Sequence, residues 1–154
     1  MSSALFANHR ESNLASTISL VEAALAELGQ PSPGSRTKDA TALHAWKIPQ
    51  GSAITRVLLL HRSEFTHLRV CATVMTVDDR VDRPALHAHL LELNASLCGA
   101  AFAVDGDRVL LVGERSTLDL DRSEVLELIR RVTTYADDHD DVLVARFGGA
   151  LGGS

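Results

Sequence analysis

The chain has 154 residues, a mass of 16.6 kDa and a formal net charge of −5, from 15 basic and 20 acidic residues. From this length we expect a single domain with a core of its own and not two domains. Only Lys38 and Lys47 are lysines, and such an acidic chain lacks the clustered positive face with which proteins bind duplex nucleic acid.

The first predicted element is a helix over residues 12–28. Five apolar residues carry this prediction: Leu14, Ile18, Val21, Leu25 and Leu28. Their spacings of four, three, four and three place them on one helical face. Gly29 can end the helix in a left-handed conformation. We expect residues 1–11 to be flexible and residues 30–41, which include two prolines, to form a linker loop.

Three aliphatic and β-branched segments follow, each bounded by turn-forming residues. They predict strands at Ala42–Pro49, Ala53–His61 and His67–Val77. Three strands in succession favour an antiparallel meander. If the second turn centres on residues 63 and 64, the register opposes three pairs: Val57 and Val70, Leu59 and Leu68, and Leu58 and Arg69.

This register sorts the side chains onto two faces. One face is aliphatic and is expected to pack on helices; it carries Val57, Leu59, Leu68, Val70 and Val74. The other face mixes apolar and basic side chains; it carries Arg56, Leu58, Leu60, Arg69, Cys71, Thr73 and Met75. We predict that this second face binds protein, because exposed apolar patches beyond a few hundred Å² usually mark a partner site.

Local signals also define the second half of the chain. Asp82 is predicted to cap a helix that runs to Leu97, with Pro84 in its first turn. The turn Asp105-Gly106-Asp107 predicts a hairpin between strands at 100–104 and 108–113, because a tight turn requires positive φ angles. Asp121 and Glu124 form a capping pair that opens the last helix.

The predicted order is therefore α-β-β-β-α-β-β-α. This order indicates an α+β fold in which helices pack on one face of an antiparallel sheet. We expect a single domain over residues 12–147, with a flexible tail at residues 148–154.

No set of residues predicts catalysis, a cofactor or a metal site. His89 and Glu92 could share one ion on a helix, but a catalytic zinc needs three protein ligands. Acidic residues between 137 and 141 oppose the dipole at a helix C-terminus, so either the helix stops early or the charges have partners. Cys71, inside an apolar strand, is expected to be a poor thiolate, because burial raises the pKa of a thiol.

Two arginines of the second face leave two interpretations open. Arg56 and Arg69 could bind an anion, since a guanidinium presents paired donors to a carboxylate or phosphate. They could equally form ion pairs with Glu64 or with acidic residues of another subunit.

Several stretches resemble the YbjN-like family of bacterial sensory-transduction regulators. They are Leu90–Leu97, Ala101–Leu111, Asp119–Asp121, Tyr135–Asp141 and Arg146–Gly149. The resemblance covers roughly residues 58–149 and implies the fold of type III secretion chaperones of the Tir-chaperone kind. It also implies a binding role, since such chaperones are small acidic homodimers that hold an extended partner segment. This chain differs from them in its long proline-containing linker and its arginine-rich sheet face.

Together, these observations predict a non-enzymatic module that binds a protein or peptide and acts as a chaperone or a regulatory adaptor. Binding would use strand addition or an apolar groove. The alternative is a signal-transduction regulator that senses a small ligand. We expect a homodimer, because residues 109–112 are hydrophobic toward both faces of the sheet. The first ten residues lack a signal-peptide pattern and no membrane-spanning run is present, so we expect a cytoplasmic protein.

Overall fold

The computed structural model describes residues 2–50, 53–62 and 65–153. Its elements, in chain order, are α1 (Ser2–Glu27), β1 (Arg36–Thr37), β2 (His44–Gln50), β3 (Ala53–Arg62), β4 (Phe65–Thr76), α2 (Arg83–Asn94), β5 (Ala101–Asp105), β6 (Arg108–Ser116), α3 (Arg122–Phe147) and β7 (Ala150–Leu151). The strands form one antiparallel sheet in the order β1-β2-β3-β4-β6-β5, and β7 pairs with β4. The predicted α+β order is confirmed, with the short strands β1 and β7 added.

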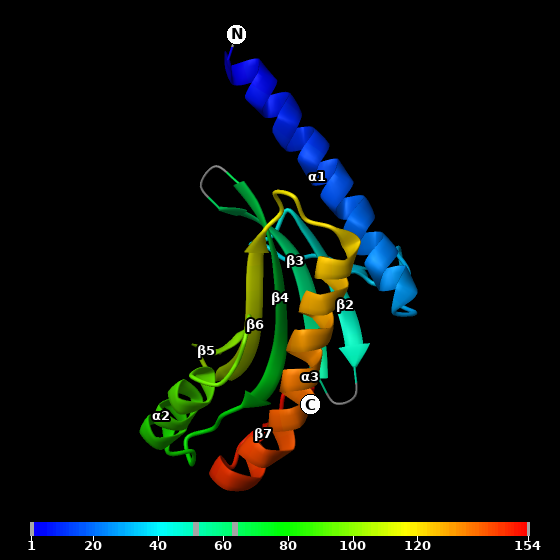
Figure 1. Ribbon diagram of the computed structural model, residues 1–154. Coiled ribbons are helices and arrows are strands. Elements are labelled where there is room, and N and C mark those ends of the chain that lie inside the picture. The colour runs from blue at the N-terminus through cyan, green and yellow to red at the C-terminus, as the bar shows by residue number, and fades with distance from the viewer. Residues whose placement is uncertain (1, 51–52, 63–64, 154) are drawn as a thin grey trace.

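One face of the sheet carries the helices. Figure 1 shows α3 lying along this face, with α1 crossing beside it. All five residues predicted to face the helices have no exposed surface: Val57, Leu59, Leu68, Val70 and Val74. They share one core with Val21 and Leu25 of α1, Leu86 of α2 and Ile129 of α3. The prediction that this face packs on helices is therefore confirmed.

The predicted register of the central hairpin is also confirmed. Val57 lies opposite Val70, and Leu58 lies opposite Arg69. The predicted turn residues, Ser63 and Glu64, lie outside the described part of the chain. Because side chains alternate along a strand, this register places Arg56 and Leu58 on the face away from α3.

The predicted N-terminal caps of two helices are confirmed. The carboxylate of Asp82 accepts a hydrogen bond from the backbone N–H of Ala85 at 3.1 Å, and Pro84 lies in the first turn of α2. At α3, Asp121 accepts from the N–H of Glu124 at 2.9 Å, while the Glu124 carboxylate accepts from the N–H of Asp121 at 3.0 Å. These reciprocal bonds form a complete capping box.

The first helix begins at Ser2, well before the predicted start at Ser12. Its N-terminal half projects past the sheet (Figure 1). The helix is fastened at Asn13, whose side-chain amide donates to the carbonyl oxygen of Thr117 at 3.4 Å. Thr117 Oγ1 lies 2.8 Å from Asn13 Oδ1 and 2.9 Å from the carbonyl oxygen of Thr66. A buried threonine thus joins α1 to β4.

Two short strands form where the sequence predicted none. Strand β1 lies within the expected linker and pairs with β2. Strand β7 lies within the expected tail, and the N–H of Gly152 donates to the carbonyl oxygen of Val74 at 3.1 Å. A Cβ atom at Gly152 would lie 2.1 Å from the carbonyl oxygen of Thr73, so this close approach requires glycine.

Strand β4 contains an irregularity that corrects the predicted position of Met75. The register with β6 shifts between Thr73 and Met75, so that β4 uses an extra residue there. As a result, Val74 and Met75 are both fully buried in the core beneath the helices. Met75 therefore does not belong to the second face, because a β-bulge reverses the alternation of side chains beyond it.

Helix α3 does not stop at its acidic residues but continues to Phe147. Asp140 is buried, with 4% of its surface exposed, whereas Asp137, Asp138 and Asp141 are exposed.

Among residues 2–50, 53–62 and 65–153, no three metal-binding side chains gather in one place. None of the helices in this described part is long and apolar enough to span a bilayer.

Candidate functional site: the open face of the sheet

The sheet surface away from α3, here called the open face, carries six of the seven residues predicted to bind protein. These are Arg56, Leu58, Leu60, Arg69, Cys71 and Thr73. Arg56 lies directly opposite Cys71, and Thr73 lies opposite Leu110 of β6. The open face thus brings together side chains from β3, β4 and β6.

The apolar part of the open face is more sheltered than the sequence suggested. Leu58 and Leu60 each have 6% of their surface exposed. They form a second, small core with Ala45, against which Ala42 and Cys71 pack. The turn before β2 causes this shelter, because it brings Ala42 against these side chains. The leucines therefore form a recessed apolar floor.

A cavity of about 230 Å³ opens above Leu58. Its lining residues are Asp39, Thr41, Ile54, Arg56, Leu58, Arg69, Cys71, Thr73, Asp105, Arg108 and Leu110. The apolar residues come from the strands, and the charged residues surround them. Such a mixture of apolar surface and convergent polar groups is typical of a binding site.

Ion pairs hold the arginines around the cavity. Arg56 Nη1 lies 3.5 Å from Asp39 Oδ2, and Arg108 pairs with Asp105 at the start of β6. Asp39 also accepts hydrogen bonds from the hydroxyl of Thr41 at 2.6 Å and from its N–H at 2.9 Å. These bonds from Thr41, together with the charge of Arg56, lower the pKa of the Asp39 carboxyl despite its partial burial.

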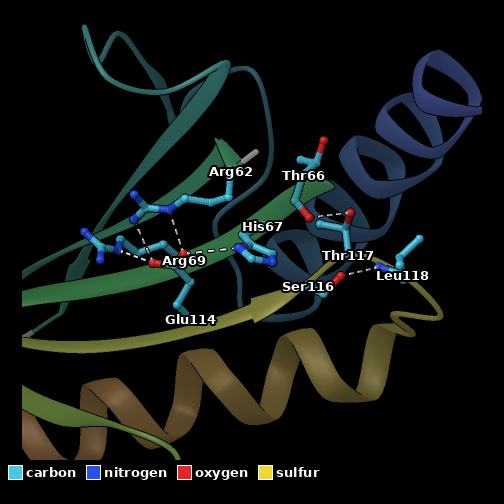
Figure 2. A network of polar contacts seen from close by, with 8 residues as sticks. All are labelled: Arg62, Thr66, His67, Arg69, Glu114, Ser116, Thr117 and Leu118. Atoms are coloured by element: carbon cyan, nitrogen blue, oxygen red, sulfur yellow. Dashed lines mark hydrogen bonds and ion pairs between the residues drawn. The ribbon is translucent and has the colours of Figure 1, made fainter. Parts of the chain in front are cut away.

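Glu114 organises a second group of charges on the open face. Figure 2 shows Arg62 and Arg69 converging on its carboxylate, with His67 beside them. The Nε atoms of Arg62 and Arg69 donate to Glu114 at 2.9 and 2.7 Å, and His67 Nδ1 lies 3.4 Å from it. Burial by itself would raise the pKa of Glu114, but the hydrogen bonds from both arginines outweigh it, so this pKa is lowered.

Cys71 lies at the centre of the open face and is not a reactive nucleophile. Burial raises the pKa of its thiol, and the charges of Arg56 and Arg69 offset this effect only in part. This agrees with the prediction of a poor thiolate. At neutral pH the protonated Cys71 therefore serves as part of the apolar floor.

The sequence interpretation missed further charged residues of the open face, among them Lys47, Arg108 and Glu114. Lys47 could have been found from its own strand, because Trp46 and Ile48 on either side of it are buried. The positions of Arg108 and Glu114 depend on the pairing of β4 with β6. No local sequence pattern indicates this pairing, because 31 residues separate Thr76 from Arg108, and α2 and β5 lie within that segment.

Exposed apolar side chains also occur at the other end of the sheet. Strand β5 is an edge strand, and α2 packs beside it. Leu91 of α2 has 70% of its surface exposed, and Val104 of β5 has 45%. An edge strand can pair with another chain through its free backbone groups. At this edge the N–H and C=O of Phe102 are already bonded to the side chain of Asn94, at 2.6 and 3.2 Å, so association here would rest mainly on the apolar side chains. This part of the surface is therefore suited to association.

Comparison with known families gives a match over residues 15–151. The matching family is TY-Chap1, described as T3SS (YopN, CesT) and YbjN peptide-binding chaperone 1. The match includes all six predicted residues that remain on the open face, and it leaves out residues 2–14 of α1. Among curated proteins, none matches the chain.

Solved structures share the fold. A chain in the crystal structure of the ExsC–ExsE complex superposes with a TM-score of 0.65 at 16% identity, covering 84% of this chain and 94% of that one. The HopA1–SchA chaperone–effector complex gives 0.59 at 14%, covering 85% and 97%. The Yersinia pestis type III secretion chaperone SycH, in complex with a fragment of YscM2, gives 0.54 at 16%, covering 78% and 96%. At these identities the likeness establishes the fold.

Proposed function

Because the chain belongs to the family of type III secretion (YopN, CesT) and YbjN peptide-binding chaperones, we propose that it binds an extended segment of a partner protein on its open face. It acts as a chaperone or a regulatory adaptor and catalyses no reaction. The observation that supports this most directly is the cavity in which the apolar residues Leu58 and Leu110 lie among three arginines. Two of the similar structures are themselves described as a chaperone with an effector or with a protein fragment.

The open face can hold an extended chain in a defined way. Apolar side chains of the partner would contact Leu58 and Leu110, while its polar backbone would meet the threonines and arginines of the rim. Alternatively, the edge strand β5 could accept a partner strand through backbone hydrogen bonds. The open face is the better candidate, because it offers side-chain contacts that select one sequence over another.

The test of this function starts from a displayed library of random peptides selected on the immobilised full-length chain. Enriched peptides are then titrated by calorimetry against the wild type, Leu110→Asp and Val142→Asp. Leu110 lines the cavity, whereas Val142 is an exposed residue of α3, so Val142→Asp is a matched control. We expect Leu110→Asp to weaken binding about tenfold or more, because it places a charge on an apolar contact surface.

Chemical-shift mapping on the unmodified protein makes this test independent of the variant's folding. The peptide should perturb amide signals of β3, β4 and β6 around Cys71 and leave those of α3 unchanged. The proposal fails if no peptide is enriched, or if the perturbed signals lie away from the open face.

A small-ligand sensor is the second candidate, and one observation favours it. Arg56, Arg69 and Arg108 line one cavity of a size that accepts a small anion. A panel of carboxylate and phosphate metabolites in a thermal-shift assay tests it. A ligand at about 100 times its Kd should add about 2.7 kcal/mol of stability, which would raise the Tm by several degrees.

A further inference from the structure

Two positive charges oppose each other across neighbouring strands of the open face. Lys47 of β2 and Arg56 of β3 are direct cross-strand partners in the antiparallel register. Both are exposed, and the neighbours of Lys47 along β2, Trp46 and Ile48, are buried in the core. Like charges in directly opposed positions destabilise a sheet. This pair therefore costs stability unless a negative charge lies close to it.

The described part of the protein neutralises this pair only weakly. Arg56 has one ion pair, the 3.5 Å contact with Asp39, and that carboxylate is also bound to Thr41. Among the described residues, no carboxylate forms an ion pair with Lys47. The side chain of Arg56 is 47% exposed, so its guanidinium has donors that remain available to a ligand.

The surroundings reinforce the positive potential. Arg69 and Arg108 line the same cavity as Arg56, and their carboxylate partners are Glu114 and Asp105. Glu114 is shared with Arg62, so these charges sum to a positive value even before Lys47 is included. This positive region lies on a chain whose net charge is −5. The positive charge of this region therefore arises from where its residues are placed and not from the overall composition of the chain.

We propose that Lys47 and Arg56 form a carboxylate subsite within the open face, which selects partner segments that carry an aspartate or glutamate over this pair. This inference rests on the proposed function, since it names the chemistry of the bound segment. Arginine can bind a carboxylate through two parallel hydrogen bonds, and Lys47 adds a third donor from the opposite strand. The adjacent apolar floor at Leu58 receives the neighbouring side chains of the same segment.

The amount of free positive charge favours a single carboxylate. A polyphosphate or nucleic acid would need several unneutralised cations, whereas here Asp39, Asp105 and Glu114 already balance most of the arginines. The apolar floor beside the pair also suits an acidic residue flanked by apolar residues better than a free anion.

The experiment uses peptides enriched on the full-length chain, each synthesised as a pair that differs only by glutamate or glutamine at one position. Binding is measured by calorimetry with the wild type, Arg56→Gln and Lys47→Gln. Two variants are controls that remove a positive charge elsewhere: Arg130→Gln and Arg122→Gln, both at exposed positions of α3. Circular dichroism verifies that each variant is folded.

For peptides that reach the subsite, the wild type should bind the glutamate form about tenfold tighter than the glutamine form. Arg56→Gln should reduce this preference to less than about twofold without weakening the glutamine form, and the controls should keep the full preference. Equal binding of the two forms at every position would overturn the subsite while leaving peptide binding intact. Absence of any peptide binding would instead overturn the proposed function.

A competition arm distinguishes a side-chain carboxylate from a free one. Glutarate at millimolar concentration should displace the glutamate peptide only weakly, because it lacks the apolar contacts. If glutarate alone binds as tightly as the peptide, the site recognises a small acid, and the subsite proposal is wrong.

Discussion

At the scale of single residues, Glu114 makes the largest number of charged contacts on the open face. Its carboxylate holds Arg62 and Arg69 on neighbouring strands, and its side chain is 22% exposed (Figure 2). Without this carboxylate, two guanidinium groups would lie side by side with no negative charge between them. Glu114 therefore preserves the shape of the rim as well as its charge balance.

Replacing Glu114 with glutamine should lower the free energy of unfolding by about 1–2 kcal/mol at pH 7, because it weakens or removes the three charge-assisted hydrogen bonds from Arg62 and Arg69. The lowered pKa of Glu114 gives this effect a pH dependence. A carboxylate whose pKa is lowered by folding stabilises the protein above its unfolded pKa, near 4.5, and this stabilisation disappears as the pH falls through the folded value. Urea unfolding at pH 7 and pH 3.5 measures both.

The difference between wild type and Glu114→Gln should therefore shrink at the lower pH. The pair Arg122–Glu27 provides a comparison, since its side chains are 59% and 42% exposed and Glu27→Gln, which removes this more exposed ion pair, should have a smaller effect. An equal difference at both pH values would show that Glu114 does not act through its charge.

At the scale of elements, helix ends carry the clearest local information. The capping box of α3 satisfies backbone N–H groups that the helix itself cannot pair. Asp121→Ala should lower the free energy of unfolding by about 1 kcal/mol, whereas Asp121→Ser should retain most of it, because serine is also a good N-cap. Thermal denaturation of both variants measures the difference. Equal losses for alanine and serine would contradict a capping role.

The attachment of α1 is a second prediction at this scale. Thr117 bridges Asn13 and the carbonyl oxygen of Thr66, and Thr117→Val removes its hydroxyl while keeping its shape. We expect faster hydrogen exchange in the N-terminal half of α1, where the Asn13 contact is weakened, and little change in α3. Ser123→Ala, at an exposed hydroxyl near the start of α3, is a control. Unchanged exchange in α1 would show that the helix needs no such attachment.

Elements that depend on local signals were predictable, whereas those that depend on distant partners were not. The hairpin at Gly106, the caps at Asp82 and Asp121, and the β3–β4 register each follow from a few neighbouring residues. Strands β1 and β7 are two residues long, too short to leave an alternating pattern, and they exist through pairing with β2 and β4. The bulge that moves Met75 into the core has no signature of its own in the sequence.

The same distinction applies to the candidate site. Alternation along β3 and β4 placed Arg56, Leu58 and Arg69 on one face. The carboxylates around them could not be predicted. Asp39 lies on a loop, and Glu114 lies on β6, which pairs with β4 although a long segment of chain separates the two strands. The sequence could therefore indicate the floor and two cations of the site, but neither their partners nor the cavity.

At the scale of the whole molecule, we predict a homodimer formed through α2 and the β5 edge. Leu91 and Val104 expose apolar surface there, on and beside an edge strand of the sheet. Light scattering coupled to size-exclusion chromatography should give twice the monomer mass at micromolar concentration. The double variant Leu91→Glu and Val104→Glu should run as a monomer, because it would bury charges in the interface.

Val142→Glu, at an equally exposed residue of α3, should remain a dimer. A wild-type monomer at high micromolar concentration would contradict the dimer prediction. A dimer that persists in the double variant would place the interface elsewhere. Neither outcome changes the prediction for the open face, which lies on a different part of the sheet from the exposed surface of α2.

The placement of every helix on one side of the sheet has a consequence for mutational tolerance along β3. Consider a saturation-mutagenesis screen that scores cellular abundance and capture of a bound peptide separately. Substitutions at Val57 and Leu59 should reduce abundance, while substitutions at Arg56 should reduce peptide capture alone. Substitutions at Leu58 and Leu60, which are buried in the small core of the open face, should lower both scores. The two scores would thereby show, at each position of β3, whether the side chain contributes to folding, to binding or to both.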